Sequence, residues 1–262
     1  MKAKWWVVLL LLGRLAGCRT GQPETAQPQE LTVFAASSLT DAFNELAQAF
    51  EAQNTAVEVV LNFASSSQLA AQLTEGAVAD VFASANATQM QNVVNSGRIT
   101  PGAEDWFVSN RLTIIVPADN PAGIHSLEDV AQPGVQLILA VKGVPVRQYT
   151  DEVVAAMAAD FQEHFYNNLV SEEDNVRQVS AKVALGEADA GIVYTSDVTP
   201  DIAGRVQQIA IPEAQNVAAA YPIAPLADAP QPELAQSFIE FVLSAEGQSI
   251  LAKWGFGPPP TS

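Results

Sequence analysis

Short apolar runs alternate with amphipathic runs along most of the chain. Each short run has the length of a buried strand and is bounded mainly by polar residues, glycine or proline. The strand-like runs cover residues 31–36, 57–63, 80–84, 111–117, 135–141 and 190–194. Strands that alternate with helices in this way predict an α/β fold with mainly parallel sheets.

Helical periodicity fills the intervals between the strand-like runs. In the first interval the apolar side chains that share one helical face are Leu39, Phe43, Leu46, Ala47 and Phe50. Further helices are predicted: one that ends at Gly76, one that begins at Ser126, and three that cover residues 149–165, 176–185 and 234–254.

Two of the strand-like runs end in serines that open a helix, at Ser37-Ser38 and at Ser65-Ser66-Ser67. A helix N-terminus offers unpaired N–H groups and the positive end of the helix dipole, so each turn is a candidate anion site. Each is also an ordinary place for a serine cap. Because ligands of parallel sheets bind at the carboxyl ends of strands, the repeated turn favours a clamp for an anion.

The N-terminus has the pattern of an export signal. Lys2 and Lys4 precede an apolar run over residues 5–12, which is too short to span a bilayer. The run leads into Leu15-Ala16-Gly17-Cys18, which resembles the lipobox of bacterial lipoproteins, although Arg14 departs from the usual pattern.

We therefore expect a lipoprotein signal peptide over residues 1–17, lipid attachment at Cys18 and a flexible tether over residues 18–30, which lack the apolar side chains of a core. The alternative is an incidental cysteine beside a signal peptide. Cys18 is the only cysteine, so the chain forms no internal disulfide.

The formal net charge of the chain is −17. Because nucleic-acid binding depends on basic patches, nucleic acid is not expected as a partner. The net field also repels an anionic ligand, which would have to be held by local neutral donors in a closed cleft. The acidity also suits the solubility of an exported protein.

The residues give little support for an enzyme. His125 and His164 lie far apart in sequence, outside any metal-binding spacing, and neither a G-x-S-x-G elbow nor a P-loop is present. A hydrolase that used Ser38 or Ser66 would need a base that the sequence does not identify. We expect a binding protein that has no catalytic residue, cofactor or bound metal cation.

Six motifs occur in order between residues 31 and 257. They are Phe34-Ala35-Ala36-Ser37-Ser38-Leu39-Thr40, Phe63-Ala64-Ser65-Ser66-Ser67, Ala79-Asp80-Val81-Phe82-Ala83-Ser84-Ala85, Val144-Pro145-Val146, Gly191-Ile192-Val193-Tyr194-Thr195-Ser196-Asp197 and Lys253-Trp254-Gly255-Phe256. Together they resemble the molybdate-binding proteins of ABC importers, the ModA family. The resemblance implies a type II periplasmic-binding-protein fold, with two α/β lobes joined by crossing hinge strands and a tetrahedral oxyanion between them.

By this resemblance, lobe one would comprise residues 31–110 and 207–262, and lobe two residues 111–206. Residues 111–117 and 206–211 would be the hinge strands.

The resemblance also implies five ligand contacts. Ser38 and Ser66 would donate hydrogen bonds from lobe one. Val146 and Val176 would donate backbone N–H groups from lobe two, and Tyr194 its phenol. Donors alone suit an unprotonated dianion and disfavour protonated phosphate. The alternative for the two valines and the tyrosine is ordinary core packing.

Arg147 stands where the family commonly has glycine. It could donate a charged hydrogen bond to the oxyanion or cap the closed cleft, or it could point into solvent.

These observations predict an extracytoplasmic, lipid-anchored, monomeric protein that captures molybdate, and tungstate as well, and delivers it to an ABC permease. The alternatives are a binding protein for another tetrahedral oxyanion such as sulfate, and a membrane-tethered oxyanion sensor without transport. The size of the cleft would decide between oxyanions, and the sequence does not give it.

Overall fold

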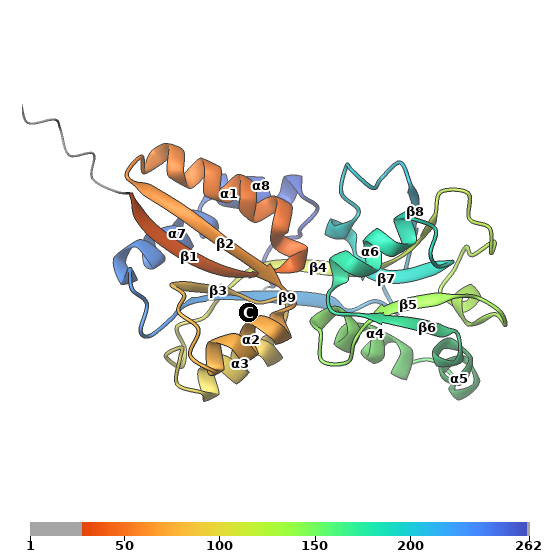
Figure 1. Cartoon of the computed structure of the whole chain (residues 1–262). Coiled ribbons are helices and arrows are strands. Elements are labelled where there is room, and N and C mark those ends of the chain that lie inside the picture. The colour runs from red at the N-terminus through yellow and green to blue at the C-terminus, as the bar shows by residue number, and fades with distance from the viewer. Residues whose placement is uncertain (1–27, 261–262) are drawn as a thin grey trace, which may run out of the picture.

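A computed structural model describes residues 28–260 of the chain. These residues form two α/β lobes that lie side by side, with strands running between them (Figure 1). The predicted arrangement of two lobes and crossing strands is therefore confirmed. The predicted signal peptide, Cys18 and most of the tether lie outside the described residues. No helix within residues 28–260 is long and apolar enough to cross a membrane.

Lobe one combines the first part of the chain with its C-terminal part. Its strands, in sheet order, are β2 (Val57–Ala64), β1 (Gln29–Ala36), β3 (Val81–Ala83), β9 (Ala218–Pro225) and the first half of β4 (Asp105–Pro117). The first three strands are parallel, and β9 is antiparallel to both β3 and β4. The sheet therefore places the carboxyl ends of β1, β2 and β3 at the same edge.

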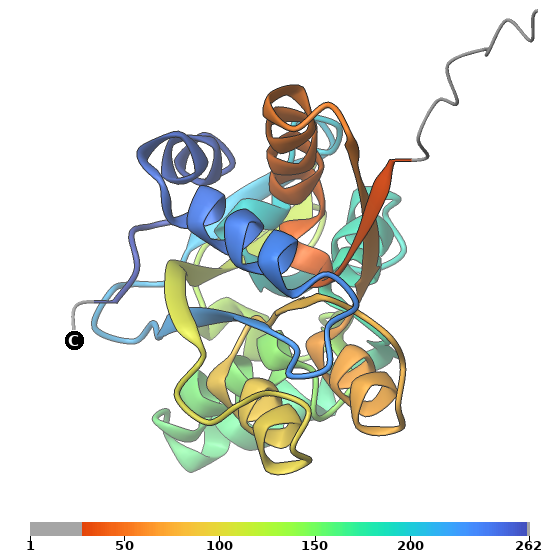
Figure 2. The same cartoon turned by 90° about the vertical axis from the view of Figure 1, so that its left-hand side faces the viewer.

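Helices cover both faces of this sheet (Figure 2). One face carries α1 (Thr40–Gln53), α7 (Pro232–Leu243) and α8 (Ala245–Lys253), and the other carries α2 (Ser66–Thr74) and α3 (Ala87–Asn95). The apolar face predicted for α1 is buried, and the ring of Phe43 packs edge-on against Phe107 and Phe238. This packing fixes the start of α1, where the first pair of serines lies.

Lobe two has its own sheet, which shares β4 with lobe one. Its strands, in order, are β8 (Val206–Ala210), the second half of β4, β7 (Ala190–Tyr194), β5 (Leu137–Ala140) and β6 (Leu169–Glu173). On one side lies α6 (Val176–Ala184), and on the other lie α4 (Pro145–Ala155) and α5 (Ala159–Asn167) (Figure 1). The 3₁₀ helices of this lobe are η2 (Glu128–Ala131) and η3 (Thr195–Asp197).

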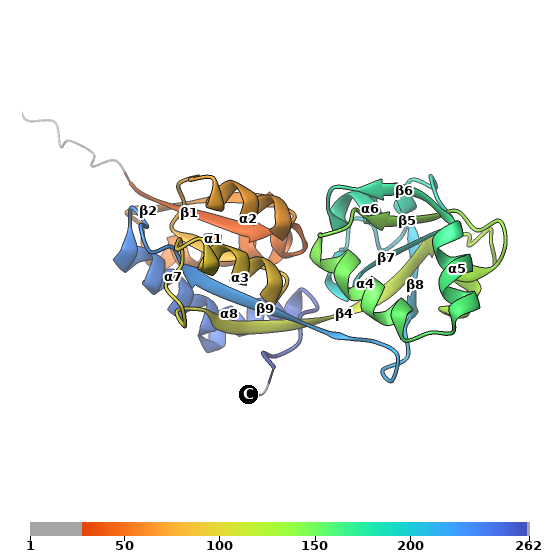
Figure 3. The ribbon, with the colours of Figure 1, turned by 90° about the horizontal axis from the view of Figure 1, so that it is seen from below.

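Strand β4 makes the first crossing between the lobes (Figure 3). Its residues 105–111 pair with β9, and residues 112–117 pair with β7 and β8. The predicted boundary at residues 206/207 differs from this arrangement, because all of β8 pairs with the lobe-two half of β4. The second crossing is the connection over residues 211–217, where the Asn216 side chain accepts from Leu112 N–H (3.2 Å) and donates to its carbonyl oxygen (2.8 Å).

Two helices predicted as continuous are each broken in two. Residues 149–155 belong to α4 and residues 159–165 to α5. Residues 156–158 separate the two helices, and the backbone of Ala158 is extended. Residues 234–254 belong to α7 and α8, separated at Ser244, whose hydroxyl caps the N–H of Gly247. A Cβ on Gly247 would lie 2.3 Å from the Phe241 carbonyl oxygen, so the turn requires glycine. Periodicity misses the first break because the apolar residues Ala156, Met157 and Ala158 continue through it.

Candidate functional site

A small cavity lies between the lobes. Lobe one lines it with Ala36, Ser37, Ser38, Ser65, Ser66 and Ala85, and lobe two with Val144, Pro145, Val146, Val176 and Tyr194. The structure thus brings together all five residues that the sequence predicts as ligand contacts. None of the described residues that line the cavity is charged, so any electrostatic preference of the site comes from dipoles and hydrogen-bond donors.

Helix N-termini from both lobes meet at the cavity. Ser66 and Val176 are the first residues of α2 and α6, and Val146 is the second residue of α4. Ser38 lies in the 3₁₀ helix η1 (Ser37–Leu39), directly before α1. N–H groups in the first turn of a helix have no partner within the helix, and the dipole gives that end a partial positive charge. The cavity therefore favours an anion.

In the second serine turn, one serine caps the helix and its neighbour is free to donate to a ligand. Ser65 is the cap: its hydroxyl accepts from Gln68 N–H (3.4 Å), and the Gln68 side chain accepts from Ser65 N–H (3.3 Å). The Ser66 hydroxyl accepts from Ala85 N–H at 2.9 Å, which leaves its own hydrogen free to donate. The interpretations as a cap and as a ligand donor are therefore compatible.

The Tyr194 hydroxyl has no hydrogen-bond partner among residues 28–260, although the residue is only 1% exposed. Burial raises the pKa of this phenol well above its ordinary value, so at neutral pH it keeps its hydrogen and can donate. A buried polar group without a partner costs about 1–3 kcal/mol. The hydroxyl therefore indicates a partner that the protein does not itself supply, such as a ligand in the cavity.

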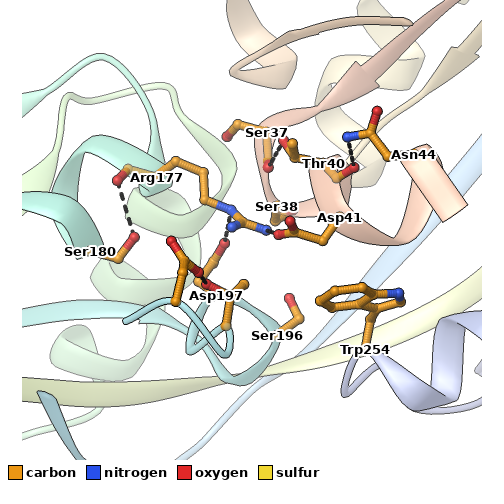
Figure 4. A network of polar contacts seen from close by, with 12 residues as sticks. Ser37, Ser38, Thr40, Asp41, Asn44, Arg177, Ser180, Ser196, Asp197 and Trp254 are labelled. Atoms are coloured by element: carbon orange, nitrogen blue, oxygen red, sulfur yellow. Dashed lines mark hydrogen bonds and ion pairs between the residues drawn. The ribbon is translucent and has the colours of Figure 1, made fainter. Parts of the chain in front are cut away.

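An arginine that the sequence analysis did not single out joins the lobes beside the cavity (Figure 4). Arg177 follows Val176 in α6, and its Nη2 lies 2.7 Å from Oδ2 of Asp41 in the first turn of α1. Its Nε lies 3.0 Å from Oδ1 of Asp197. These contacts are ion pairs whose N–H directions do not align as hydrogen bonds. They connect the starts of two helices that line the cavity from opposite lobes.

Asp197 is fully buried in lobe two. Burial raises the pKa of its carboxyl group to about 6, and the nearby Arg177 opposes that rise. The other carboxylate oxygen accepts from Tyr194 N–H at 3.1 Å. Asp197 therefore contacts both Arg177, which forms the ion pair between the lobes, and the backbone of Tyr194, which lines the cavity.

Two neutral hydrogen bonds join the lobes at the start of α3. The Asn86 side-chain amide donates to Gln148 Oε1, and the Gln89 amide donates to the Gly143 carbonyl oxygen, both at 3.0 Å. Together with the ion pair between Arg177 and Asp41, these bonds hold side chains of the two lobes in direct contact.

The structure contradicts both positions predicted for Arg147. The side chain is only 2% exposed and does not line the cavity. Its guanidinium contacts Asp151 (2.8 Å) and Glu172 (2.5 Å), donates to the Ala140 carbonyl oxygen and lies over the ring of Tyr166. As the third residue of α4, it leaves the helix toward β5 and β6, so its contribution is to the packing of lobe two.

Comparisons with known proteins agree with this architecture. Residues 31–257 match the family described as bacterial extracellular solute-binding protein. Over 259 residues the chain is 38% identical to the molybdate-binding protein ModA of Mycobacterium tuberculosis (strain H37Rv), and the match covers 97% of this chain and 96% of that protein.

Two solved structures share the fold at 20% sequence identity. The periplasmic molybdate-binding protein of Azotobacter vinelandii matches with a TM-score of 0.75, over 88% of this chain and 100% of that one. The sulfate-binding protein SubI of Mycobacterium tuberculosis matches with a TM-score of 0.81, over 88% and 87% of the two chains. The predicted periplasmic-binding-protein fold is therefore confirmed.

Proposed function

Because the chain belongs to the bacterial extracellular solute-binding proteins, and among them to the molybdate-binding ModA proteins, we propose that it binds molybdate in the cavity between its lobes. The relatives are binding proteins and not enzymes, and so is this chain. Their ligand is an oxyanion and not a cofactor.

The observation that carries this proposal is the buried, unpartnered hydroxyl of Tyr194 at a cavity where several helix N-termini meet. We propose that Tyr194, Val146 and Val176 donate to the oxyanion from lobe two, and that Ser38 and Ser66 donate from lobe one. Each hydrogen bond to a charged group contributes about 1.5–3 kcal/mol, so five of them can offset the desolvation of a dianion. Arg147 is left out of this set because its carboxylate partners hold it elsewhere.

The neutral lining supports selection by protonation state. Molybdate, tungstate and sulfate carry no hydrogen at neutral pH, whereas phosphate is a mixture of HPO₄²⁻ and H₂PO₄⁻, and the hydrogen of either species needs an acceptor. No carboxylate lies among the described residues that line the cavity. A site that leaves a ligand hydrogen without a partner discriminates strongly against that ligand.

We further propose that the protein also takes tungstate, is anchored outside the cytoplasm through lipidated Cys18, and delivers its ligand as a monomer to an ABC permease. The lipobox-like sequence before Cys18 supports the anchor. The relatives' solute-binding family supports the place in an importer.

Titration of the purified protein with molybdate, tungstate, sulfate and phosphate, followed by calorimetry, tests the proposed function. Molybdate and tungstate are expected to bind tightly, sulfate more weakly and phosphate least. Equal affinity for sulfate and molybdate would favour the sulfate alternative, and the absence of binding to every oxyanion would refute the proposal.

Changing Val176 to proline is expected to weaken molybdate binding about tenfold without disrupting α6. Proline removes the N–H of the first helical residue, a position that accepts proline well. The preceding Asn175 already has the extended backbone that proline requires, with φ −158° and ψ 167°. Calorimetry should compare Val176→Pro with Val176→Ala, which keeps the N–H. Equal affinity of the two variants would show that this N–H does not reach the ligand.

A further inference from the structure

A second buried tyrosine contacts a residue of the site without itself lining the cavity. Tyr221 lies in β9, and its Oη is 3.0 Å from Ser38 Oγ. We propose that Tyr221 orients the Ser38 hydroxyl so that its hydrogen points into the cavity, and thereby helps the site to select oxyanions that carry no hydrogen. This inference rests on the proposed function.

Packing holds the Tyr221 ring in place. The residue is 0% exposed, and its ring makes edge-on contacts with the rings of Phe107, Tyr194 and Phe256 at centroid distances of 6.4, 5.8 and 5.7 Å. The ring has little freedom to move, so the position of its hydroxyl oxygen is determined by the fold rather than by the ligand.

The amide of Asn110 determines which partner of Tyr221 can accept. Asn110 is buried in β4 at the crossing between the lobes, and its Oδ1 lies 2.9 Å from Arg111 N–H, which can only donate. The Thr195 hydroxyl donates to the same oxygen. The amide nitrogen is therefore the atom that faces Ser196 Oγ, at 2.8 Å, and Tyr221 Oη, at 3.5 Å. Asn110 can therefore donate a hydrogen bond to Tyr221 but cannot accept one from it.

The direction of the hydrogen bond between Tyr221 and Ser38 follows from this. Burial raises the pKa of the Tyr221 phenol well above its ordinary value, so the phenol keeps its hydrogen, which needs an acceptor. Among the described residues Ser38 Oγ is the only acceptor that forms a hydrogen bond with Tyr221 Oη, since the Tyr194 hydroxyl forms none. Tyr221 therefore donates to Ser38.

Ser38 is left with one hydrogen of its own. Its hydroxyl has no other hydrogen-bond partner within residues 28–260, and the residue lines the cavity. Once the oxygen accepts from Tyr221, the hydrogen is free for an oxygen atom of the ligand. Without the Tyr221 hydroxyl, Ser38 could rotate and present a lone pair to a protonated oxyanion.

Tyr221→Phe tests this role, and calorimetry provides the molybdate and phosphate dissociation constants near neutral pH. We expect molybdate binding to weaken roughly tenfold, in line with the loss of one oriented hydrogen bond to a charged group, while phosphate binding does not weaken. Tyr149→Phe is the control, because Tyr149 packs against the ring of Tyr194 but makes no hydrogen bond to Ser38. It should leave the ratio of the two affinities unchanged.

A double-mutant cycle with Ser38→Ala separates positioning from a general structural effect. In the Ser38→Ala background, Tyr221→Phe should have no further effect on molybdate affinity. A loss that persists in that background would overturn the inference, as would an equal loss for both oxyanions or no loss at all. Where phosphate binding is too weak to measure, the cycle alone decides. Failure of the wild-type protein to bind any oxyanion would instead refute the proposed function.

Discussion

Replacing Tyr194 with phenylalanine is expected to weaken molybdate binding about tenfold to a hundredfold while leaving the free protein at least as stable as the wild type. In the free protein the buried hydroxyl has no partner among the described residues, so its removal relieves a desolvation penalty. In the complex the same hydroxyl would donate to a charged ligand, a bond that contributes about 1.5–3 kcal/mol. Calorimetry gives the affinity, and urea unfolding gives the stability.

Tyr166→Phe is a matched control, because the Tyr166 hydroxyl donates to Asp151 at 2.7 Å, away from the cavity. It should show the opposite pattern: a lower free energy of unfolding and an unchanged molybdate affinity. If Tyr194→Phe instead destabilised the protein and left the affinity intact, the Tyr194 hydroxyl would have a structural role and not a binding one.

Replacing Arg177 with methionine is expected to lower the free energy of unfolding by about 3–5 kcal/mol near neutral and alkaline pH. Asp197 is fully buried, and Arg177 is its only cationic partner in the part of the chain that the structure describes. Removing the guanidinium leaves a buried carboxylate without compensation and also breaks the ion pair with Asp41 across the lobes. Urea unfolding at a series of pH values measures the loss.

The loss should be smaller in acid. Burial raises the pKa of Asp197 to about 6 from an ordinary value of 3.8. When the pKa of a carboxyl group is higher in the folded protein than in the unfolded chain, protonation of that group stabilises the fold. This stabilisation is complete at pH values below the ordinary pKa and is lost as the pH rises through the pKa of the folded protein. Without Arg177 the pKa of Asp197 in the folded protein rises further. The variant therefore continues to lose stability up to a higher pH, whereas the stability of the wild type has already levelled off. The difference between the two proteins should therefore be small near pH 5 and large near pH 8.

Two further variants check this explanation. Adding Asp197→Asn to Arg177→Met should restore most of the stability near pH 8, because the double variant has no uncompensated charge at position 197. Asp41→Asn removes only the interlobe ion pair and should cost less than about 1 kcal/mol, without the same pH dependence. A loss in Arg177→Met that is equal at both pH values would contradict the role assigned to Asp197.

Much of the fold was predictable because its signals are local. The predicted strand over residues 190–194 is β7, and the apolar face predicted for α1 is buried as expected. The strands β6 and β9 and the helix α3 were not predicted. Polar residues interrupt the apolar pattern in β6, and small residues weaken it in β9, where Ala218, Ala219 and Ala220 have little strand preference of their own. The pairing of β9 with β3 and β4 makes it a strand.

The candidate site was also predictable only where its signals are local. The serine turns lie at helix starts, where unpaired N–H groups follow from the helix itself, so the chemistry of helix ends could point to them. The two valines and Tyr194 were indicated only by the resemblance to the ModA family. The position of Arg147 was not predictable in this way. Because it directly follows Val146, the sequence suggested that its side chain contacts the ligand. Its side chain instead meets Glu172, which is distant along the chain.

The sequence by itself determined the α/β class, the repeated strand-serine-helix turn and the serines that could present neutral donors to an anion. Periodicity and the chemistry of helix ends depend on residues within a few positions of one another. Only the tertiary structure decided that the Ser66 hydroxyl accepts from Ala85, that Arg177 joins the lobes, and that Tyr221 reaches Ser38. These roles depend on contacts between segments that are far apart in sequence, and no local pattern encodes them.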